Sequence, residues 1–337
     1  MEPFAGTPVE ASGLLFIGDL HLSSSPPGRR RQGYMGQGLA KLRHLIDLAN
    51  EMRFAPIMLG DVFDRERDPS EALKTRLLRE LHRSWTTVLT NVGNHDKQGA
   101  VLSESDSLAV VSETGHPLRA FASSGPGAEF LIEGRRVGVG FTPHDQPVPE
   151  DVRGAFPGAD AVFWITHHDI GFEGAYPGAL EPHPIEGCNV VVNGHMHLRK
   201  QPVTAGGTMW CNFGSIGRTA IDAVNHEPSG WSFRPSAGLV RHPVPFERDV
   251  FNLTGRLVAA ASPGEGAASA GSAFLDMLAA GRAAAAPAFS SDGTILLEAL
   301  VSRLEAAGAG QEVLAMALDL HRRAVARRSG ERRPAPG

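Results

Sequence analysis

The chain has 337 residues, of which 42% are hydrophobic and 20% are charged, and its formal net charge is -5. This composition is typical of a globular protein with one large domain, alone or with a smaller one, and it excludes fibrous and disordered proteins. The apolar runs are far shorter than the ~20 residues of a membrane-spanning helix, and no stretch resembles a signal peptide. With only two cysteines, a disulfide framework is excluded. We therefore expect a cytoplasmic protein without a membrane partner. The negative charge disfavours nucleic-acid binding by bulk electrostatics.

Six short apolar runs are typical of buried strands. They comprise residues 14–17, 56–59, 87–92, 137–141, 161–166 and 189–192. Further strand-rich stretches lie within residues 130–141, 208–213 and 238–246. The alternation of strands with helical patterns, followed by a strand-rich middle, predicts a layered α/β protein with mixed sheets rather than a purely parallel one.

Two amphipathic helices are predicted between the first three strands. Apolar residues recur at three- and four-residue steps between Leu39 and Met52, which indicates one buried helix face. Asp68 is expected to cap the second helix, because Pro69 suits the first helical position and Glu71 completes a capping box. The first ninety residues therefore predict a βαβαβ unit.

The composition divides the chain at about residue 250. Residues 251–290 are rich in Ala and Gly and predict a linker. Residues 291–337 predict a small helical hairpin that ends in a tail with six arginines. A solvated tail and a surface for a nucleic acid or a protein partner are both compatible with this pattern.

Polar side chains that can bind metals follow five of the predicted strands. They are Asp19 and His21, Asp61, Asn94 with His95 and Asp96, His167 with His168, and His195 with His197. Because the carboxyl ends of the strands share one edge in an open α/β sheet, we expect these side chains to converge. Residues two apart on an extended segment point the same way, so each Asp-x-His or His-x-His pair presents two groups. Such groups are ligands for Mn²⁺, Fe²⁺ or Zn²⁺.

The series Asp-x-His, Gly-Asp-x-x-Asp, Gly-Asn-His-Asp, His and Gly-His-x-His resembles the signature of the calcineurin-like metallophosphoesterases. It runs from Gly18 to His197. The resemblance implies a four-layer α/β/β/α sandwich with mixed sheets, and residues 1–250 as its catalytic domain. The signature does not specify the substrate, because phosphatases, cyclic-nucleotide phosphodiesterases, nucleotidases and nucleases share it.

The resemblance also implies two divalent metal ions, with Mn²⁺ favoured over Fe²⁺ and Zn²⁺. One ion is expected on Asp19, His21, Asp61 and His197, and the other on Asp61, Asn94, His167 and His195. Asp61 is expected to bridge them, since a carboxylate has two oxygens. The family position favours His167 over His168, and neighbouring side chains on an extended segment point in opposite directions.

His95 is expected to face the substrate, because its neighbour Asn94 is a metal ligand. Protonated His95 would stabilise developing charge or donate a proton to the leaving oxygen. Asp96 is expected to orient and charge it. For Asp64, support of the ligands and a structural turn remain open as alternatives.

Two basic segments look similar to the branch that contains SbcD-like DNA repair nucleases and bacteriophage phosphoesterases. One is the loop with Arg29, Arg30 and Arg31, and the other ends at Arg218. These arginines are expected to bind phosphates beside the scissile one. A solvated loop and a structural ion pair are the alternatives.

The favoured function is a metal-dependent phosphodiesterase that acts on DNA, with an ATPase partner docked on the C-terminal helices and a homodimer as further expected partners. The alternative enzyme is a phosphatase or small-nucleotide phosphodiesterase. A binding or assembly protein with a degenerate site is the third hypothesis. The complete ligand set, together with His95, argues against this third hypothesis.

Overall fold

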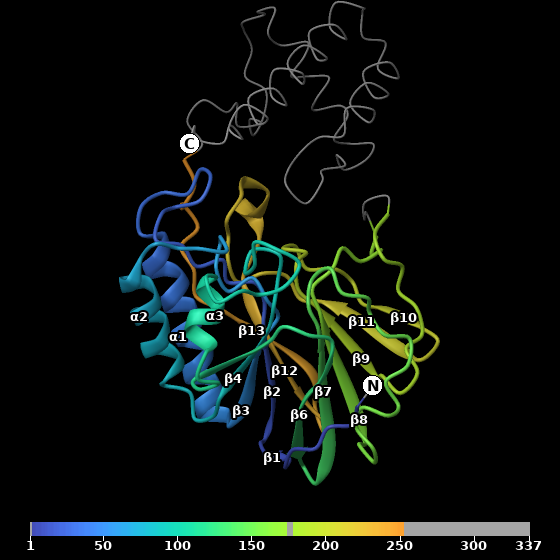
Figure 1. Ribbon diagram of the computed structural model, residues 1–337. Helices are drawn as coiled ribbons and strands as arrows, with labels where there is room; N and C mark the ends of the chain where they lie inside the picture. The colour runs from blue at the N-terminus through green and yellow to red at the C-terminus, as the bar shows by residue number, and fades with distance from the viewer. Residues whose placement is uncertain (1, 174–177, 253–337) are drawn as a thin grey trace, which may run out of the picture. The chain divides into compact units, whose positions relative to one another are not determined.

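The computed structural model describes residues 2–173 and 178–252, and it consists of two mixed β-sheets packed face to face (Figure 1). The predicted α/β sandwich with mixed sheets is confirmed. The linker expected at residues 251–290 lies outside the described residues beyond Asn252, as do the helical hairpin and basic tail expected at residues 291–337.

The six-stranded sheet has the order β13-β12-β2-β3-β4-β5. Its strands are β2 (Gly13–Ile17), β3 (Phe54–Met58), β4 (Val88–Asn91), β5 (Leu118–Phe121), β12 (Ser229–Arg234) and β13 (Gly238–Pro243). Strands β2 to β5 are parallel, whereas β12 runs antiparallel to β2 and β13. The predicted βαβαβ unit forms the parallel part of this sheet.

The seven-stranded sheet has the order β1-β6-β7-β8-β9-β11-β10. Its strands are β1 (Val9–Glu10), β6 (Gly125–Ile132), β7 (Arg135–Thr142), β8 (Ala161–Thr166), β9 (Val190–Asn193), β10 (Val203–Ala205) and β11 (Thr208–Asn212). Strands β7, β8, β9 and β11 are parallel, so their carboxyl ends share one edge.

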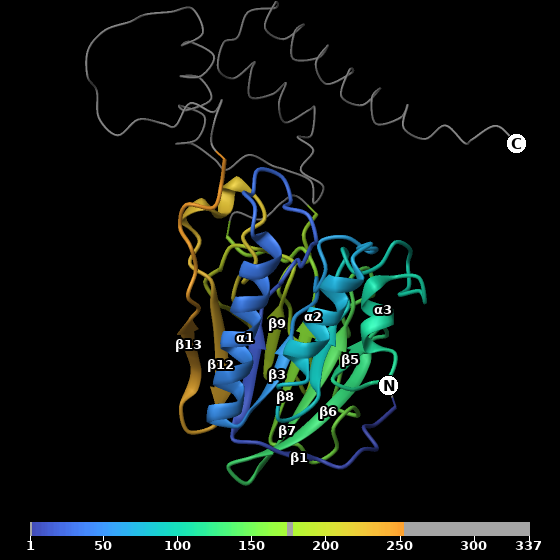
Figure 2. The same cartoon turned by 90° about the vertical axis from the view of Figure 1, so that its left-hand side faces the viewer.

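The helices lie on the outer face of the six-stranded sheet (Figure 2). They are α1 (Tyr34–Met52), α2 (Glu71–Leu81) and α3 (Ser107–Ser112), and a 3-10 helix spans Ile221–Asn225. Among the described residues, no helix has the length and hydropathy needed to cross a membrane.

The start of α2 differs from the prediction. Ser70 is its N-cap and accepts a hydrogen bond from the backbone N of Leu73 at 3.2 Å. Asp68 accepts instead from the backbone N of Ser24 and Ser70. The physical reason is that these two bonds occupy both oxygens of the Asp68 carboxylate, one of them with a partner distant in the sequence, so Ser70 takes the cap position. The helix therefore begins two residues after the predicted first position.

Three apolar layers hold the fold together. One lies between the helices and the six-stranded sheet, and a second fills the space between the two sheets, where the rings of Phe16 and Phe163 stack at 5.5 Å. The third lies on the outer face of the seven-stranded sheet around Trp164 and Trp210. In the described part of the chain, irregular segments rather than helices cover this third layer.

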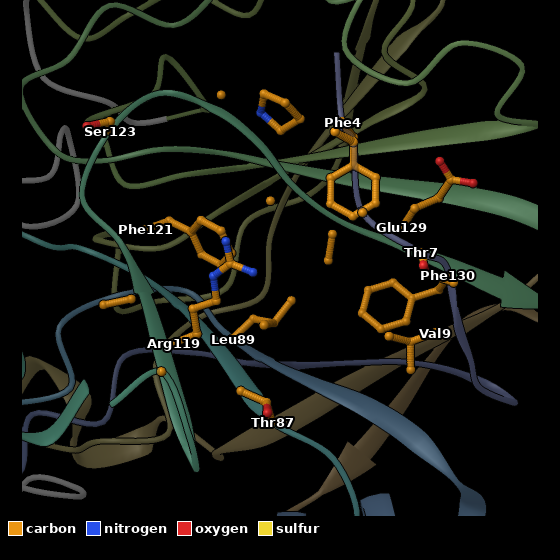
Figure 3. Close-up of a pocket in the computed structure, with 18 of the residues that line it drawn as sticks. Phe4, Thr7, Val9, Thr87, Leu89, Arg119, Phe121, Ser123, Glu129 and Phe130 are labelled. Atoms are coloured by element: carbon orange, nitrogen blue, oxygen red, sulfur yellow. The ribbon is translucent and has the colours of Figure 1, made fainter. Parts of the chain in front are cut away.

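A cavity of about 1040 Å³ lies between the N-terminal segment and strands β5 and β6 (Figure 3). Phe4, Phe121 and Phe130 line it, together with Arg119. None of the expected metal ligands borders this cavity. It is therefore separate from the candidate site described next.

Candidate active site and metal centre

The five polar motifs meet at one edge of the sandwich. Strands β2, β3 and β4 of the six-stranded sheet end in three of the motifs, and β8 and β9 of the other sheet end in the remaining two. Both sheets therefore contribute side chains to a single site. The structure brings together Asp19, His21, Asp61, Asn94, His167, His195 and His197.

The first expected ligand set is a compact cluster. Ligand atoms of Asp19, His21, Asp61 and His197 lie within 4.8 Å of one another. The Nε2 atoms of His21 and His197 are 2.8 Å apart, and Nε2 of His21 is 3.6 Å from Oδ2 of Asp61. These four side chains can surround one cation.

The second expected set is adjacent and shares Asp61. Ligand atoms of Asp61, His167 and His195 lie within 4.8 Å of one another, with Oδ2 of Asp61 at 3.2 Å from Nε2 of His167. Oδ1 of Asn94 is 2.9 Å from Nδ1 of His195. Asp61 is thus common to both sets, as a bridging carboxylate must be.

Unpaired buried atoms show that these residues fit divalent ions. Both carboxylate oxygens of Asp19 are buried without a hydrogen-bond partner, and so is Nδ1 of His21. Buried polar atoms without partners are rare in folded proteins because they cost free energy. Carboxylate oxygens and imidazole nitrogens suit Mn²⁺, Fe²⁺ and Zn²⁺, so a metal is the partner that this donor set indicates.

The charges at the base of the site balance one another. Burial raises the pKa of Asp19. Burial also acts to raise the pKa of Asp61, but His167 and His21 outweigh it and hold this pKa well below its usual range. In return, Asp61 and Asp19 overcome the burial of His167 and raise its pKa to about 10. Asp61 and His167 therefore each favour the charged form of the other.

The backbone of the site is held in uncommon conformations. His21, Asp61 and His195 have φ values of 47°, 47° and 69°, in the left-handed region that non-glycine residues rarely adopt. Such residues cost about 1–3 kcal/mol each and cluster at functional sites. Close packing also requires glycine nearby, because a Cβ atom on Gly93 would lie 2.0 Å from Oδ1 of Asp61.

His95 is half-buried beside the metal ligands. Its backbone N donates to Oδ1 of Asp61 at 2.9 Å, and its ring meets that of His21 edge to face, with the centroids 4.8 Å apart. Ring atom Nδ1 is 2.7 Å from the backbone carbonyl of Asp64. Burial opposes the charged ring, but the charge of Asp61 and the bond to the Asp64 carbonyl raise the pKa of His95.

Asp96 does not orient the His95 ring by a hydrogen bond, although its charge contributes, after Asp61 and Asp64, to raising the pKa of His95. Its two oxygens accept from the backbone N of Phe63 at 3.2 Å and of Gly93 at 3.0 Å. Asp96 therefore ties together the loops that follow β3 and β4, and the Asp64 carbonyl orients the His95 ring instead. Burial raises the pKa of the Asp96 carboxyl to about 7.

Asp64 supports the site rather than only forming a turn. Its carboxylate Oδ1 is 3.8 Å from Nδ1 of His21. Burial raises its pKa to about 6. The backbone carbonyl of Asp64 therefore faces His95, the proposed proton donor, and its carboxylate faces His21, a proposed ligand.

His167 rather than His168 lies in the cluster. Nε2 of His168 is 2.8 Å from the carbonyl of Gln146, and burial lowers its pKa to about 4. The pair thus points in opposite directions, as alternation along an extended segment predicts.

Two further residues border the site, of which Asp169 was missed by sequence reasoning. Oδ1 of Asp169 lies 3.3 Å from Nε2 of His195, and the ring of His144 lies 5.4 Å from that of His195. Asp169 directly follows the His-His pair, so its position in the sequence was an available signal. His144 follows β7, whose end lies beside that of β8.

Two of the four arginines expected at the substrate are buried. Arg218 is 1% exposed, and its guanidinium donates to the backbone carbonyls of residues 223, 224 and 247. Arg30 is 8% exposed and donates to the carbonyl of Arg218 at 2.8 Å. Their donors hold the backbone, so these contacts correct the expectation that Arg30 and Arg218 bind substrate.

The other two arginines lie on the surface. Arg31 pairs with Asp249 at 2.9 Å, and the backbone carbonyl of Arg29 accepts from the backbone N of Asn252 at 2.8 Å. A substrate contact for Arg29 and Arg31 stays a prediction.

Comparison with known proteins gives a family match and distant similarity to solved structures. The sequence profile described as Calcineurin-like phosphoesterase matches residues 13–199. No curated protein matches the chain. Among solved structures, NAD nucleotidase (NadN) of Haemophilus influenzae is similar with a TM-score of 0.41 and 13% identity, over 69% of this chain and 50% of that one. A 5'-nucleotidase precursor from Thermus thermophilus is similar with a TM-score of 0.38 and 14% identity, over 69% and 54%.

The chain spans about half the length of each of these two structures. The family profile, by contrast, matches more than half of this chain, and the matched residues include every expected metal ligand. The chain belongs to the calcineurin-like phosphoesterase family.

Proposed function

We propose that this protein is a two-metal phosphoester hydrolase that acts on a compact phosphorylated substrate. The observation that supports the proposal is the pair of ligand sets that share Asp61. When bound, two divalent cations activate a water molecule for attack on phosphorus and neutralise charge on the phosphate oxygens. We expect Mn²⁺ first, with Fe²⁺ and Zn²⁺ as alternatives, because the donor set combines imidazoles with carboxylates and one amide.

His95 is the proposed proton donor to the leaving oxygen. A carbonyl oxygen can only accept a hydrogen bond, so Nδ1 of His95 donates to Asp64 and carries a proton. The protonated ring then has its second proton on Nε2, which is left for the substrate. The charge of Asp61 favours this protonated form. His95 is therefore a general acid held in a fixed orientation. A positioned general acid typically increases a reaction rate by 10²–10⁴-fold.

The substrate approaches the site from one side. Asp19, Asp61 and His167 are buried at its base. Asn94, His95, His195 and His197 are only half-buried and form the accessible side. A substrate phosphate on this side would contact His95 and the residues of both ligand sets at once.

A compact substrate is proposed ahead of DNA because of the arginines. Arg30 and Arg218 are buried on backbone carbonyls, so they do not form the basic track that flanking phosphates require. Arg65, directly after Asp64, is exposed beside the site. Its charge acts on the Asp64 carboxylate, and we propose it as a contact for the substrate phosphate.

A nuclease is the second candidate function, because Arg29 and Arg31 remain on the surface. The narrower resemblance to SbcD-like nucleases, the ATPase partner, the homodimer and the cytoplasmic location stay predictions. The segment expected to bind the ATPase lies outside the described residues.

The test compares substrates with the same metal-loaded protein. We expect Mn²⁺-dependent hydrolysis of para-nitrophenyl phosphate or of its bis-ester, and loss of activity after exhaustive chelation. Labelled single- and double-stranded oligonucleotides are assayed alongside. Cleavage of oligonucleotides without turnover of either chromogenic ester would favour the nuclease, and full activity after chelation would overturn both.

A further inference from the structure

One short segment after β11 contacts the backbone on both sides of a proposed ligand. Nδ2 of Asn212 donates to the carbonyls of Met196 at 2.8 Å and Leu198 at 2.9 Å. The backbone N of Ser215 donates to the carbonyl of His197 at 2.9 Å. Three consecutive carbonyls around His197 therefore accept hydrogen bonds from residues 212–215.

The same segment contacts a second ligand from the other sheet. The backbone N of Gly217 donates to the carbonyl of Asp19 at 2.9 Å. A Cβ atom on Gly18 would lie 2.0 Å from the carbonyl oxygen of Gly214, so the two backbones touch. Residues 212–218, named the bracket below, thus join the loop after β2 to the loop after β9.

Buried side chains hold the bracket in turn. Nζ of Lys41 on α1 donates to the carbonyl of Ile216 at 2.7 Å. Oγ of Ser215 donates to the carbonyl of Gly217 at 2.6 Å, and Nε2 of His226 lies 2.6 Å from the carbonyl of Ser215. Lys41, Ser215 and His226 are none of the proposed metal ligands, and each contacts a backbone carbonyl of the bracket.

Lys41 is the unusual member of this arrangement. It is 6% exposed, and Arg30 and Arg218 are the nearby charges that repel it most. A buried ammonium beside like charges costs free energy that apolar packing would not. Its hydrogen bond holds the bracket at the midpoint between Ser215 and Gly217, the residues that contact the two ligands.

We propose that the bracket fixes Asp19 and His197 at the separation that one metal ion requires, and that Lys41 is a positioning residue for this ion. The inference rests on the proposed two-metal function. Among the described residues, the bracket makes no hydrogen bond to Asn94, His167 or His195. Loss of Lys41 should therefore weaken the ion on Asp19, His21 and His197 more than the other.

The test is a Mn²⁺ titration of the chelator-stripped full chain by calorimetry, with bound metal counted by mass spectrometry. Lys41→Met is compared with Lys74→Met, a matched change on α2, where Lys74 pairs with Glu71. We expect two ions in the wild type and in Lys74→Met. In Lys41→Met, one ion should bind with unchanged affinity and the other roughly 10–100-fold more weakly, the range for groups that orient metal ligands.

A double variant identifies which ion is affected. His197→Ala already removes a ligand of the first set, so Lys41→Met added to His197→Ala should cause little further loss of metal affinity. If Lys41→Met does not fold, Ser215→Ala removes the bond to the Gly217 carbonyl and should shift affinity in the same direction.

One set of results would contradict the proposed role of the bracket, and a different set would contradict the two-metal function on which it rests. Unchanged affinity for both ions in Lys41→Met, or equal weakening of both, contradicts the bracket, and a lower melting temperature alone does not rescue it. A wild type that binds fewer than two ions contradicts the two-metal function instead, so the two failures are distinguishable.

Discussion

The ring Nδ1 of His95 lies 2.7 Å from the backbone carbonyl oxygen of Asp64. This contact joins the Gly-Asn-His-Asp motif to the Gly-Asp-x-x-Asp motif, which also supplies the bridging Asp61. Because the orienting group is a carbonyl, substitution of the Asp64 side chain leaves it in place. The direct way to remove the proposed acid is to change His95 itself.

We expect His95→Ala to lose about 10²-fold or more in turnover while both metal ions stay bound. The reason is that His95 lies outside the two expected ligand sets; ligand atoms of His21, Asp64 and His95 also lie within 4.8 Å of one another, so the metal count is the decisive readout. Steady-state kinetics and metal analysis on the same preparation check this. Metal loss that parallels the loss of turnover would mean that His95 is itself a ligand.

Asp61→Asn should reduce the occupancy of both ions. The substitution keeps the size of the side chain, but it removes the negative charge of a carboxylate whose Oδ2 lies near both His21 and His167. Metal content after dialysis against a fixed Mn²⁺ concentration measures the effect. Retention of one ion at full occupancy would show that Asp61 does not bridge.

Asp169→Asn should weaken the ion on His195 by roughly 10–100-fold. A carboxylate on the outer ring nitrogen fixes the orientation of a ligand histidine and raises its basicity, and Asp169 is 3.3 Å from Nε2 of His195. The ion on Asp19, His21 and His197 should be unaffected, which is the opposite of the Lys41→Met result. A calorimetric titration that shows two wild-type affinities would contradict this role.

The sequence was sufficient to predict the parallel strands and the converging ligands. Buried parallel strands are continuous apolar runs, and their carboxyl ends meet by topology, so residues such as Asp19 and Asp61 follow directly from the pattern. The helix-start signal was less complete. The Asp68 carboxylate accepts from the backbone N of Ser24, a partner distant in the sequence that the capping pattern did not reveal, and Ser70 caps α2 instead.

The roles of Arg218 and Asp96 could not be predicted, because the folded structure decides which backbone groups these side chains reach. An arginine near a metal edge has the same local sequence whether it faces phosphate or the interior, and Arg218 turns inward to carbonyls of segments that follow it. Asp96 is likewise attached to the loop after β3. Burial in tertiary contacts, not spacing, determines both.

The contribution of Lys41 to the free energy of unfolding should increase as the pH rises from 7 to 9, whereas the raised pKa of His167 acts in the opposite direction over this range. Burial, with the like charges of Arg30 and Arg218, lowers the pKa of Lys41 to about 7, whereas an unfolded lysine titrates near ~10.4. At Lys41, the folded state thus binds fewer protons than the unfolded state between these values, so stability from this group is gained with pH in this window. The expected gain is on the order of 2 kcal/mol.

Urea unfolding of the wild type and Lys41→Met at both pH values isolates this contribution. The variant lacks the titrating group but keeps His167, so its free energy of unfolding should rise by about 2 kcal/mol less between these pH values than that of the wild type. An equal dependence on pH in the two proteins would show that Lys41 is not the source.

The last prediction concerns substrate size. If the substrate is compact, Arg65→Met should raise KM for a small phosphoester by about tenfold, the loss of one charge-assisted contact of ~1.4 kcal/mol. Joint replacement of Arg29 and Arg31 by alanine should leave this KM unchanged, because a small ligand at the metals does not reach flanking sites. For a polynucleotide, the same double variant would weaken binding and flatten its salt dependence by about one unit of slope per lost phosphate contact. Measurement of KM for the chromogenic esters and of DNA affinity at several salt concentrations separates the two. Salt-dependent DNA binding that is lost in the double variant, combined with cleavage of that DNA in the wild type, would replace the compact substrate by a nucleic acid.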